Sequence, residues 1–509
     1  MLKDSSEKAV PAIPEIEKGT ATFADNVLTL AGGTTIALTV TVLASPITSR
    51  LFGPEAFGLA SLFRSGAVML AAIACLRYEM AIVLPKNDED AVQLFALCYI
   101  ILIAMTALTA ILTYLFGTQV LFYMKVSELN PILWLFPIYV FLLGLQIPLN
   151  SWYTRQKQFN IKATNRILNS FPISIGEIGG GWAGFRTGTN LVVIRFFSLI
   201  ISPAFLVWRL LRGDVRFIIR NVNPKEILRS AKKYIKFPIF DTWSILLAQL
   251  STDAPILLLT SFFSPAICGL YSKATYLLLL PSIVIGKSVG QVFLQESAAA
   301  KAARMNLAGL FETVFNRMIT IGTLPFAILA IIGPELFELF LGARWTESGG
   351  YAQILMPQIF LGFLLGSIDS LFWTLGKQEL NLISNALFLF MRVAILIYGG
   401  LILRDVRVTL FIYMVANVLI RLWLISFFIR ATKVSATKPI THFLRCIAYA
   451  VPSVMPIAAM KWWLGLEAFY LVALTPVFAI PYIALVLRHD LILRNLLSNY
   501  FRRVLSFKK

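Results

Sequence analysis

The sequence has few charged residues and almost no histidine. Of its 509 residues, 58% are hydrophobic and only 14% are charged, against roughly 25% charged in ordinary soluble proteins. A soluble fold cannot bury that much apolar surface, so most of the chain is expected to lie in lipid. With only two histidines, His442 and His489, histidine-based acid–base catalysis has little to work with.

Cysteine motifs and nucleotide-binding motifs are missing too. None of the four cysteines has CxxC spacing and all lie in apolar runs, which argues against a metal site or a disulfide framework and predicts small buried hydrophobic residues. The chain contains no GxxxxGK[ST] loop, so ATP hydrolysis is not expected. These absences predict a protein that is not an enzyme and has no catalytic residues, metal or cofactor.

Apolar stretches of membrane-spanning length follow one another along the chain. A stretch of about 20 apolar residues crosses a bilayer, and fourteen are predicted. The segment near 167–184 is the weakest, because it contains Glu177 and three consecutive glycines. The predicted spans lie near 25–48, 57–76, 91–116, 131–151, 167–184, 189–211, 239–263, 267–290, 313–333, 351–374, 380–403, 408–429, 443–464 and 466–487.

Basic residues outnumber acidic residues in the chain, which gives a formal net charge of +19. Thirty of the 45 basic residues fall in segments on the side of the N-terminus, and seven fall on the opposite side. Because cytoplasmic segments are rich in Lys and Arg, this distribution predicts a multi-pass protein of the inner cell membrane with both termini in the cytoplasm. It also accounts for most of the charge without a nucleic-acid partner.

One short turn occurs twice. LFGPEAFGLAS at 51–61 returns as FFSPAICGLYS at 262–272, six predicted spans later, and FLLG at 141–144 returns at 363–366. An even number of spans gives parallel repeats related by an axis along the membrane normal. We therefore expect an all-α membrane protein of two six-helix bundles related by a pseudo-two-fold axis, with two further C-terminal helices. The prolines of the repeat would fix the chain between helices, and its glycines would allow close helix approach.

The predicted repeat divides the chain into six parts. The linker between the bundles is basic, and its second part is predicted either to lie on the inner leaflet as an amphipathic helix or to be solvated. The parts are a disordered cytoplasmic tail (1–22), an N-terminal bundle (23–212), the cytoplasmic linker (213–238), a C-terminal bundle (239–430), two added helices (431–487) and a basic cytoplasmic tail (488–509).

Eight basic residues lie within or at the edges of predicted spans. Each would cost about 2.5–3.5 kcal/mol at the centre of a lipid-exposed helix. Those near span ends can extend to the membrane surface: Arg166, Lys287 and Arg317. The deeper ones are predicted to line a water-filled cavity that binds substrate, with an internal salt bridge as the alternative: Arg64, Arg195, Lys273, Arg392 and Arg421.

Acidic residues within spans are fewer, so a cavity between the bundles would be net positive and would attract an anionic headgroup, phosphate in particular. Asp253 and Asp369 are candidates for a site that binds a coupling ion, a proton or sodium. The alternative is that each balances the charge of a neighbouring arginine.

Several of these residues belong to motifs of a known family. RLFGPEAFGLASLF at 50–63, LRYEMAIVLPKNDEDA at 76–91 and KFP at 236–238 resemble the bacterial and archaeal polysaccharide flippases. These belong to the multidrug/oligosaccharidyl-lipid/polysaccharide exporter superfamily and include O-antigen and exopolysaccharide repeat-unit transporters. One departure is Ser264, which stands where the first copy of the turn has Gly53.

The resemblance implies a lipopolysaccharide or polysaccharide biosynthesis protein that works by alternating access. Its cargo would be a polyprenyl-pyrophosphate-linked oligosaccharide, moved from the inner to the outer leaflet with the headgroup in a basic cavity. Membrane lipids and other glycan-assembly proteins would be its partners. A cation-coupled multidrug antiporter of the same superfamily is one alternative, although mid-membrane cations disfavour cationic drugs. A membrane glycan polymerase or ligase is another, although the outer loops are short.

Overall fold

The computed structural model describes residues 15–302 and 306–489, and every regular element in these ranges is helical, as predicted. Residues 1–14 and 490–509 of the two predicted tails lie outside the described residues, but 15–22 belong to a helix. The elements are α1 (Glu15–Leu51), α2 (Pro54–Ile73), η1 (Tyr78–Val83), α3 (Asp88–Tyr123), η2 (Ser127–Ile132), α4 (Leu135–Arg155), α5 (Phe159–Trp182), α6 (Gly188–Arg212), α7 (Val215–Asn221), α8 (Pro224–Lys233), η3 (Phe237–Asp241), α9 (Thr242–Phe262), α10 (Pro265–Pro281), η4 (Ser282–Gly286), α11 (Lys287–Ala302), α12 (Ala308–Leu341), η5 (Ala343–Trp345), α13 (Thr346–Gly366), α14 (Leu371–Thr374), α15 (Gln378–Tyr398), η6 (Gly399–Leu403), α16 (Val406–Ala431), α17 (Thr437–Trp462) and α18 (Ala468–His489).

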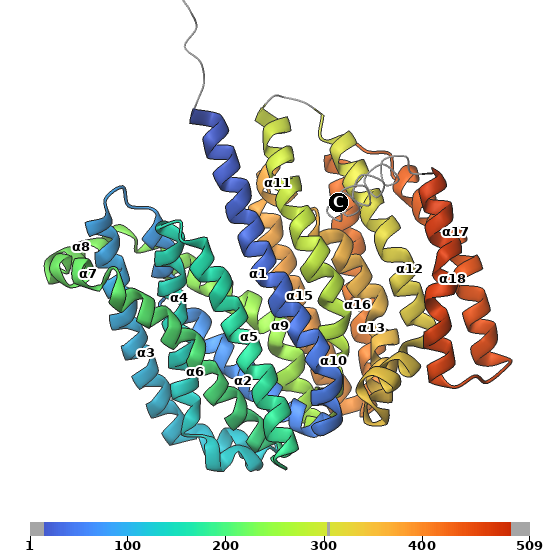
Figure 1. Ribbon diagram of the computed structural model, residues 1–509, viewed down its shortest axis with the longest axis horizontal. Coiled ribbons are helices and arrows are strands. Elements are labelled where there is room, and N and C mark those ends of the chain that lie inside the picture. The colour runs from blue at the N-terminus through green and yellow to red at the C-terminus, as the bar shows by residue number, and fades with distance from the viewer. Residues whose placement is uncertain (1–14, 303–305, 490–509) are drawn as a thin grey trace, which may run out of the picture.

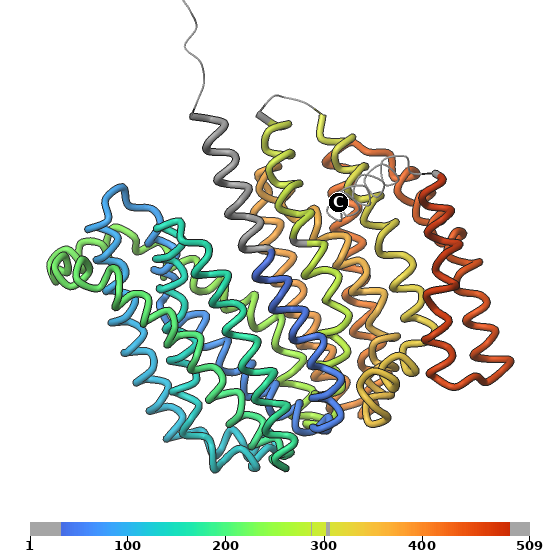
Figure 2. The backbone as a smooth tube through the Cα atoms, viewed as in Figure 1, coloured from blue at the N-terminus to red at the C-terminus, as the bar shows by residue number. Residues whose placement is uncertain are grey.

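The helices form two lobes (Figures 1 and 2). Helices α1–α6, from blue to green, make the N-lobe, and α9–α16, from green to orange, make the C-lobe. Helices α17 and α18 pack against each other and against α12, at the edge of the C-lobe away from the N-lobe. The lobes meet where α2 packs against α9 and α10.

Twelve helices of the described chain are long and apolar enough to cross a membrane, so the predicted count of fourteen is not confirmed. The other two predicted spans correspond to α1 and α5, which pack against each other. Helix α5 carries Lys162, Arg166 and Glu177 within its 24 residues. These charges explain why its segment is the weakest of the predicted spans.

The repeated turn forms the closest contact between the lobes. A Cβ atom on Gly58 would overlap the carbonyl oxygen of Pro265, and one on Gly269 would overlap that of Pro54. Each copy of the turn therefore makes the same contact with the other copy. A two-fold axis between parallel repeats requires such a reciprocal contact. The predicted close approach at both glycines is confirmed. We call this the α2–α10 contact, at the lower end of the helices in Figure 1.

The two copies of the turn start their helices differently. Pro54 and Pro265 each occupy the first helical position, where a missing N–H costs nothing and the fixed φ favours a helix. Ser264 additionally accepts a hydrogen bond from the Ile267 backbone N–H at 3.2 Å, and Gly53 has no side chain to do so. Ser264 thus caps α10, which is the structural effect of its departure from the first copy.

Further bonds hold the lobes together beside the α2–α10 contact. The indole N–H of Trp345, which is fully buried, donates to the Ser49 carbonyl oxygen at 2.8 Å. Arg50 donates to the Leu339 carbonyl oxygen at 2.8 Å. The Trp345 ring also meets Phe57 of α2 edge to face, with centroids 5.4 Å apart. This end of the molecule is therefore closed by packed aromatic rings and backbone hydrogen bonds.

The linker packs on the N-lobe at the opposite end of the helices. Ile218 of α7 and Ile227 of α8 are buried in the N-lobe core, and the Tyr78 hydroxyl donates to the Ala231 carbonyl oxygen at 2.9 Å. Most of the basic side chains of α8 point away from the lobe. The second part of the linker is thus a helix whose apolar residue Ile227 packs on the N-lobe, and its predicted place on the inner leaflet stays a prediction.

Two motifs of the sequence resemblance meet beside the linker. In the RYE motif, Arg77 lies 2.9 Å from the carboxylate of Glu79 and 3.8 Å from that of Asp241, just after the KFP motif. Burial raises the pKa of Glu79, although the charge of Arg77 opposes this shift. Arg77 therefore joins the turn after α2 to the segment just before α9.

Candidate functional site

The predicted cations separate into two clusters, and the first lies where the lobes meet. Arg195 of α6 donates from Nε to the Glu177 carboxylate of α5 at 2.7 Å, and both side chains are largely buried. Lys273 of α10 is only 8% exposed, with its Nζ 4.3 Å from the centroid of the Phe57 ring. The Arg195 guanidinium lies 5.4 Å from the same ring. Phe57 therefore faces two cations, one from each lobe.

Arg64 of α2 completes this interface cluster. Arg64 is close enough to interact electrostatically with Tyr139 of α4 and with Tyr276 of α10, and these helices belong to different lobes. The Arg64 side chain is exposed. Neither Arg64 nor Lys273 has a hydrogen bond or ion pair with any residue that the structure describes. The cluster contains three cations and one acid, so it keeps a net positive charge.

The second cluster lies inside the C-lobe. Arg392 of α15 donates to the Asn417 side-chain oxygen at 2.9 Å and to the Ser251 carbonyl oxygen at 2.8 Å. Its guanidinium lies 5.0 Å from the Phe388 ring centroid, and that of Arg421 lies 5.5 Å from the same centroid. We call these residues the C-lobe cluster. No acid of the described chain lies within ion-pair distance of either arginine.

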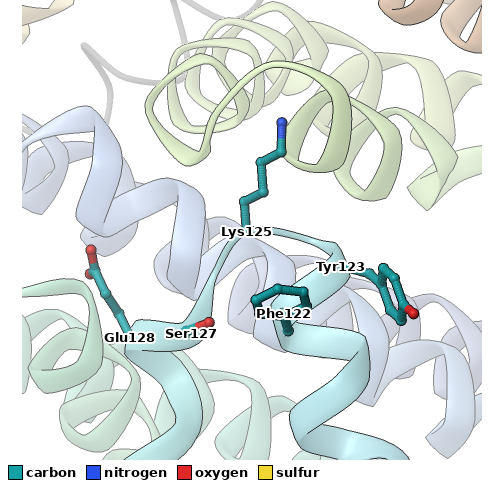
Figure 3. Close-up of a pocket in the computed structure, with 5 residues that line it drawn as sticks. All are labelled: Phe122, Tyr123, Lys125, Ser127 and Glu128. Carbon is teal, nitrogen blue, oxygen red and sulfur yellow. The ribbon is translucent and has the colours of Figure 1, made fainter.

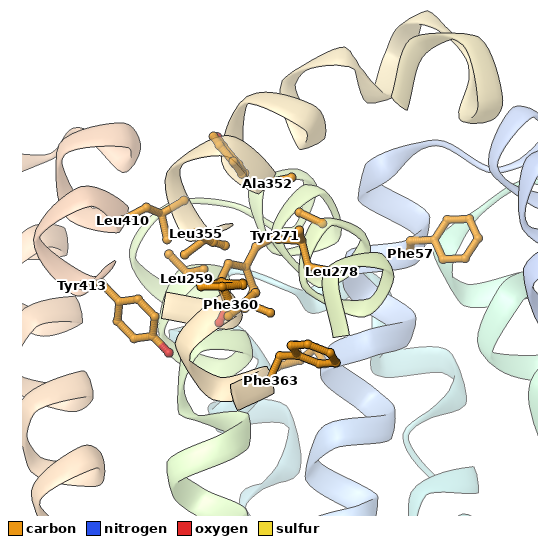
Figure 4. Packing of buried hydrophobic residues seen from close by; sticks show 14 of the residues in the cluster. Phe57, Leu259, Tyr271, Leu278, Ala352, Leu355, Phe360, Phe363, Leu410 and Tyr413 are labelled. Carbon is orange, nitrogen blue, oxygen red and sulfur yellow. The ribbon is translucent and has the colours of Figure 1, made fainter. Parts of the chain in front are cut away.

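Helix α10 separates the two clusters. Tyr271 interacts with Tyr413 and Arg392 on the C-lobe side, whereas Lys273, two residues later, faces Phe57. Residues two apart in a helix point to different faces. Figure 4 shows Phe57 and Tyr413 on opposite sides of α10, with Tyr271 on that helix between them. The five predicted cations therefore do not converge on one point.

The two predicted acids, Asp253 and Asp369, form no ion pair with any residue that the structure describes. Asp253 of α9 is buried and accepts a hydrogen bond from Gln249 in the same helix. Asp369 lies in the turn that follows Gly366, the last residue of α13. The equivalent glycine of the first repeat, Gly144, lies inside α4, which continues without a break. Asp369 is exposed, and its charge acts on Arg421 without forming an ion pair. Both acids remain candidates for an ion site.

Sequence reasoning missed the aromatic residues of both clusters. Phe57, Trp345 and Phe388 lie among 39 phenylalanines and 10 tryptophans, so nothing in their type marks them. The Arg195–Glu177 pair was foreseen only as the general alternative of an internal salt bridge. A cation near an aromatic ring gains about 2 kcal/mol when it is desolvated, which helps to hold Lys273 without a carboxylate partner.

Neither of the two best-defined cavities coincides with a cluster. One, of about 530 Å³, lies at the loop between α3 and α4, where Phe122, Tyr123 and Lys125 project from the surface (Figure 3). The other, of about 270 Å³, is an apolar groove between α10, η4, α12 and α13, with Leu280 and Phe326 in its wall. The groove begins at Leu280 of α10, seven residues after Lys273.

Comparison with known proteins agrees with this architecture. The lipid II flippase MurJ in its inward closed conformation is similar with a TM-score of 0.69 and 12% identity, over 95% of this chain and 100% of that chain. A multidrug resistance MATE family transporter of the MOP superfamily, in an inward-facing conformation, gives a TM-score of 0.64 and 16% identity, over 82% of this chain and 99% of that one. These likenesses show the fold.

A third similar structure is a MOP superfamily transporter from Pyrococcus furiosus, with a TM-score of 0.51 and 16% identity, over 81% of this chain and 96% of that chain. The comparison with curated proteins gave no match. A model of the family described as "polysaccharide biosynthesis protein" matches residues 47–349, more than half of the chain. With its helical lobes and apolar helices of membrane-spanning length, the chain is a multi-pass membrane protein with the MOP-superfamily transporter fold, and it belongs to the polysaccharide biosynthesis protein family.

Proposed function

We propose that this protein is a flippase that moves a polyprenyl-pyrophosphate-linked oligosaccharide from the inner to the outer leaflet of the cell membrane. The observation that carries the proposal is the interface cluster, in which Arg64 and Lys273 present N–H donors with no partner in the described chain. A pyrophosphate bridge offers negative charge and acceptor oxygens on both phosphates. Arg64 would bind it through the guanidinium fork, and Lys273 as a point charge.

The α2–α10 contact supports alternating access between the lobes. It lies at one end of the interface cluster, where the Phe57 and Trp345 rings pack against each other beside Lys273. With the termini in the cytoplasm, the closed end faces outward and the cluster receives cargo from the inside. Separation of α2 from α10 would then open the outer side. The apolar groove beside α10 supports a role for the carrier lipid, because the lipid tail can stay at the protein surface.

The membrane potential can drive this transport. A potential that is negative inside favours outward movement of an anion by about 2.3 kcal/mol per charge per 100 mV. A coupling ion would add to this drive, and Asp253 and Asp369 are the residues that we propose for it. The positive charge of both clusters disfavours a cationic drug as cargo.

Reconstituted transport tests the proposed function. In liposomes that contain a polyprenyl-pyrophosphate-linked sugar with a dithionite-sensitive fluorophore, the protein should bring the inner-leaflet fluorophore into reach of external dithionite. Lys273→Gln should slow this step to about a tenth or less, because a hydrogen bond to a charged group contributes about 1.5–3 kcal/mol. Arg166→Gln is the control, because Arg166 lies on α5 outside the interface cluster and donates to the Thr34 hydroxyl of α1. Equal rates in protein-containing and empty liposomes would refute the proposal.

Thiol labelling tests the proposed orientation. All four native cysteines are buried, so their background reaction should be low. We expect a cysteine at Ser127 to react with an impermeant thiol reagent added to intact cells, and one at Arg229 to react only after the membrane is opened. Ser127 is exposed between α3 and α4, and Arg229 is exposed on the linker. The reverse pattern would overturn the orientation.

A further inference from the structure

The C-lobe cluster contains an arginine with unused hydrogen-bonding capacity. Arg421 donates no hydrogen bond to any residue that the structure describes, and its Nε is buried without a partner. Arg392 is bonded only to neutral groups, those of Asn417 and Ser251. A buried donor without a partner costs free energy, more so when it carries a charge. The cluster is therefore incomplete without an anion.

Packing holds the two arginines close to each other. Both guanidinium groups lie over the ring of Phe388, so their charges repel across a shared neighbour. Gly362 of α13 lies directly against the Arg421 guanidinium, where a Cβ atom would overlap Nη1. The only acid whose charge acts on Arg421 in the described chain is Asp369, which is exposed and forms no ion pair with it. The site is thus shaped around a guanidinium that has no bound acceptor.

Accessible side chains lie at this cluster and beside it. Asp369 is exposed in the turn after α13, and the side chains of Arg392 and Arg421 are partly exposed. A hydrated ligand can therefore reach the cluster. The interface cluster lies on the other face of α10, so a single phosphate cannot contact both clusters. An extended cargo with two separated anionic groups can.

We infer that the cargo carries a second anionic group on its glycan, separate from the pyrophosphate, and that Arg392 and Arg421 bind it. This inference rests on the proposed function and narrows the substrate class to acidic oligosaccharides. A sugar carboxylate and a phosphate substituent share the chemistry, since both accept paired N–H bonds from a guanidinium. Both guanidinium groups lie over the Phe388 ring, so that each can bond a different oxygen of one anion.

Paired lipid-linked sugars test the inference in the full-length protein. Affinities in lipid nanodiscs would be measured by isothermal titration calorimetry for three polyprenyl-pyrophosphate-linked disaccharides, identical except that one is neutral, one ends in glucuronic acid and one bears a phosphate substituent. We expect the protein to bind at least one acidic form about tenfold more tightly than the neutral form. The acidic form with the larger gain in affinity over the neutral form shows whether the site binds a carboxylate or a phosphate.

Two variants separate this site from the interface cluster. Arg421→Gln should abolish the preference for the acidic sugar and leave the affinity for the neutral sugar unchanged. Gly362→Ala keeps the charge but displaces the guanidinium, and it should reduce the preference as well. Arg317→Gln removes one positive charge from the C-lobe outside the cluster and should change neither quantity.

The outcomes for the function and for the inference are distinct. Equal affinity for neutral and acidic sugars in the wild-type protein, or a preference that survives Arg421→Gln, would overturn the second anion site and leave the flippase proposal standing. Failure to bind any of the three sugars would contradict the proposed function itself.

Discussion

Arg195→Met is expected to lower the free energy of unfolding by about 3–5 kcal/mol, because it leaves a buried charge without its partner. The Arg195–Glu177 pair is short, at 2.7 Å, and both side chains are largely buried. Removing the arginine leaves the buried carboxylate of Glu177 without its ion-pair partner. Thermal unfolding in detergent, followed by intrinsic tryptophan fluorescence, measures the loss.

A double variant is the control for this prediction. Glu177→Leu combined with Arg195→Met removes both charges, and it should recover most of the lost stability, since replacing a whole buried pair by apolar side chains is often neutral. If Arg195→Met is as stable as the wild type, the pair is hydrated and the interface cluster is more open than its burial indicates.

Gly269→Val is expected to open the α2–α10 contact. Its Cβ would overlap the Pro54 carbonyl oxygen, so the helices must separate. Cys268, next to this glycine, is fully buried, and its Sγ lies 3.9 Å from the Gly58 carbonyl oxygen. Its accessibility therefore reports the separation of the helices. Its reaction with an impermeant thiol reagent should become at least about tenfold faster, which corresponds to a shift of about 1.4 kcal/mol. Mass spectrometry identifies the labelled cysteine.

The pseudo-two-fold contact provides a second variant and a control. Gly58→Val should act in the same way, because its Cβ would overlap the Pro265 carbonyl oxygen. Gly179 of α5 has open space around it, so Gly179→Val should leave the reactivity of Cys268 unchanged. Unaltered labelling in both contact variants would show that α2 and α10 do not meet at these glycines in the membrane.

The repeated turn was the part of the fold that the sequence predicted best. Its Pro and Gly residues mark where two helices begin and where backbones approach, and both effects depend on residue type alone. The number of spans was harder to predict, since α5 carries charges that favour protein contact over lipid. The π-helical segment η4, which joins α10 to α11 after Pro281, was not predicted.

The clusters were only partly predictable because their geometry depends on helix packing. Depth along a helix identified Lys273 and Arg392 as cations within membrane-spanning segments, but depth does not show that α10 stands between them. The roles of the Phe57 ring and of Gly362, which has no side chain, depend on neighbouring residues of other helices. Pairwise contacts between distant segments leave no local signal in one sequence.

Binding of the isolated headgroup tests the central claim most directly. In nanodiscs of neutral lipid, a polyprenyl pyrophosphate without sugar should bind the wild-type protein in a salt-sensitive manner. The Arg64→Gln, Lys273→Gln double variant should bind it at least about tenfold more weakly, because two charged hydrogen-bond donors are lost. Equal dissociation constants for the two proteins would contradict the assignment of the interface cluster as the site for the anionic headgroup.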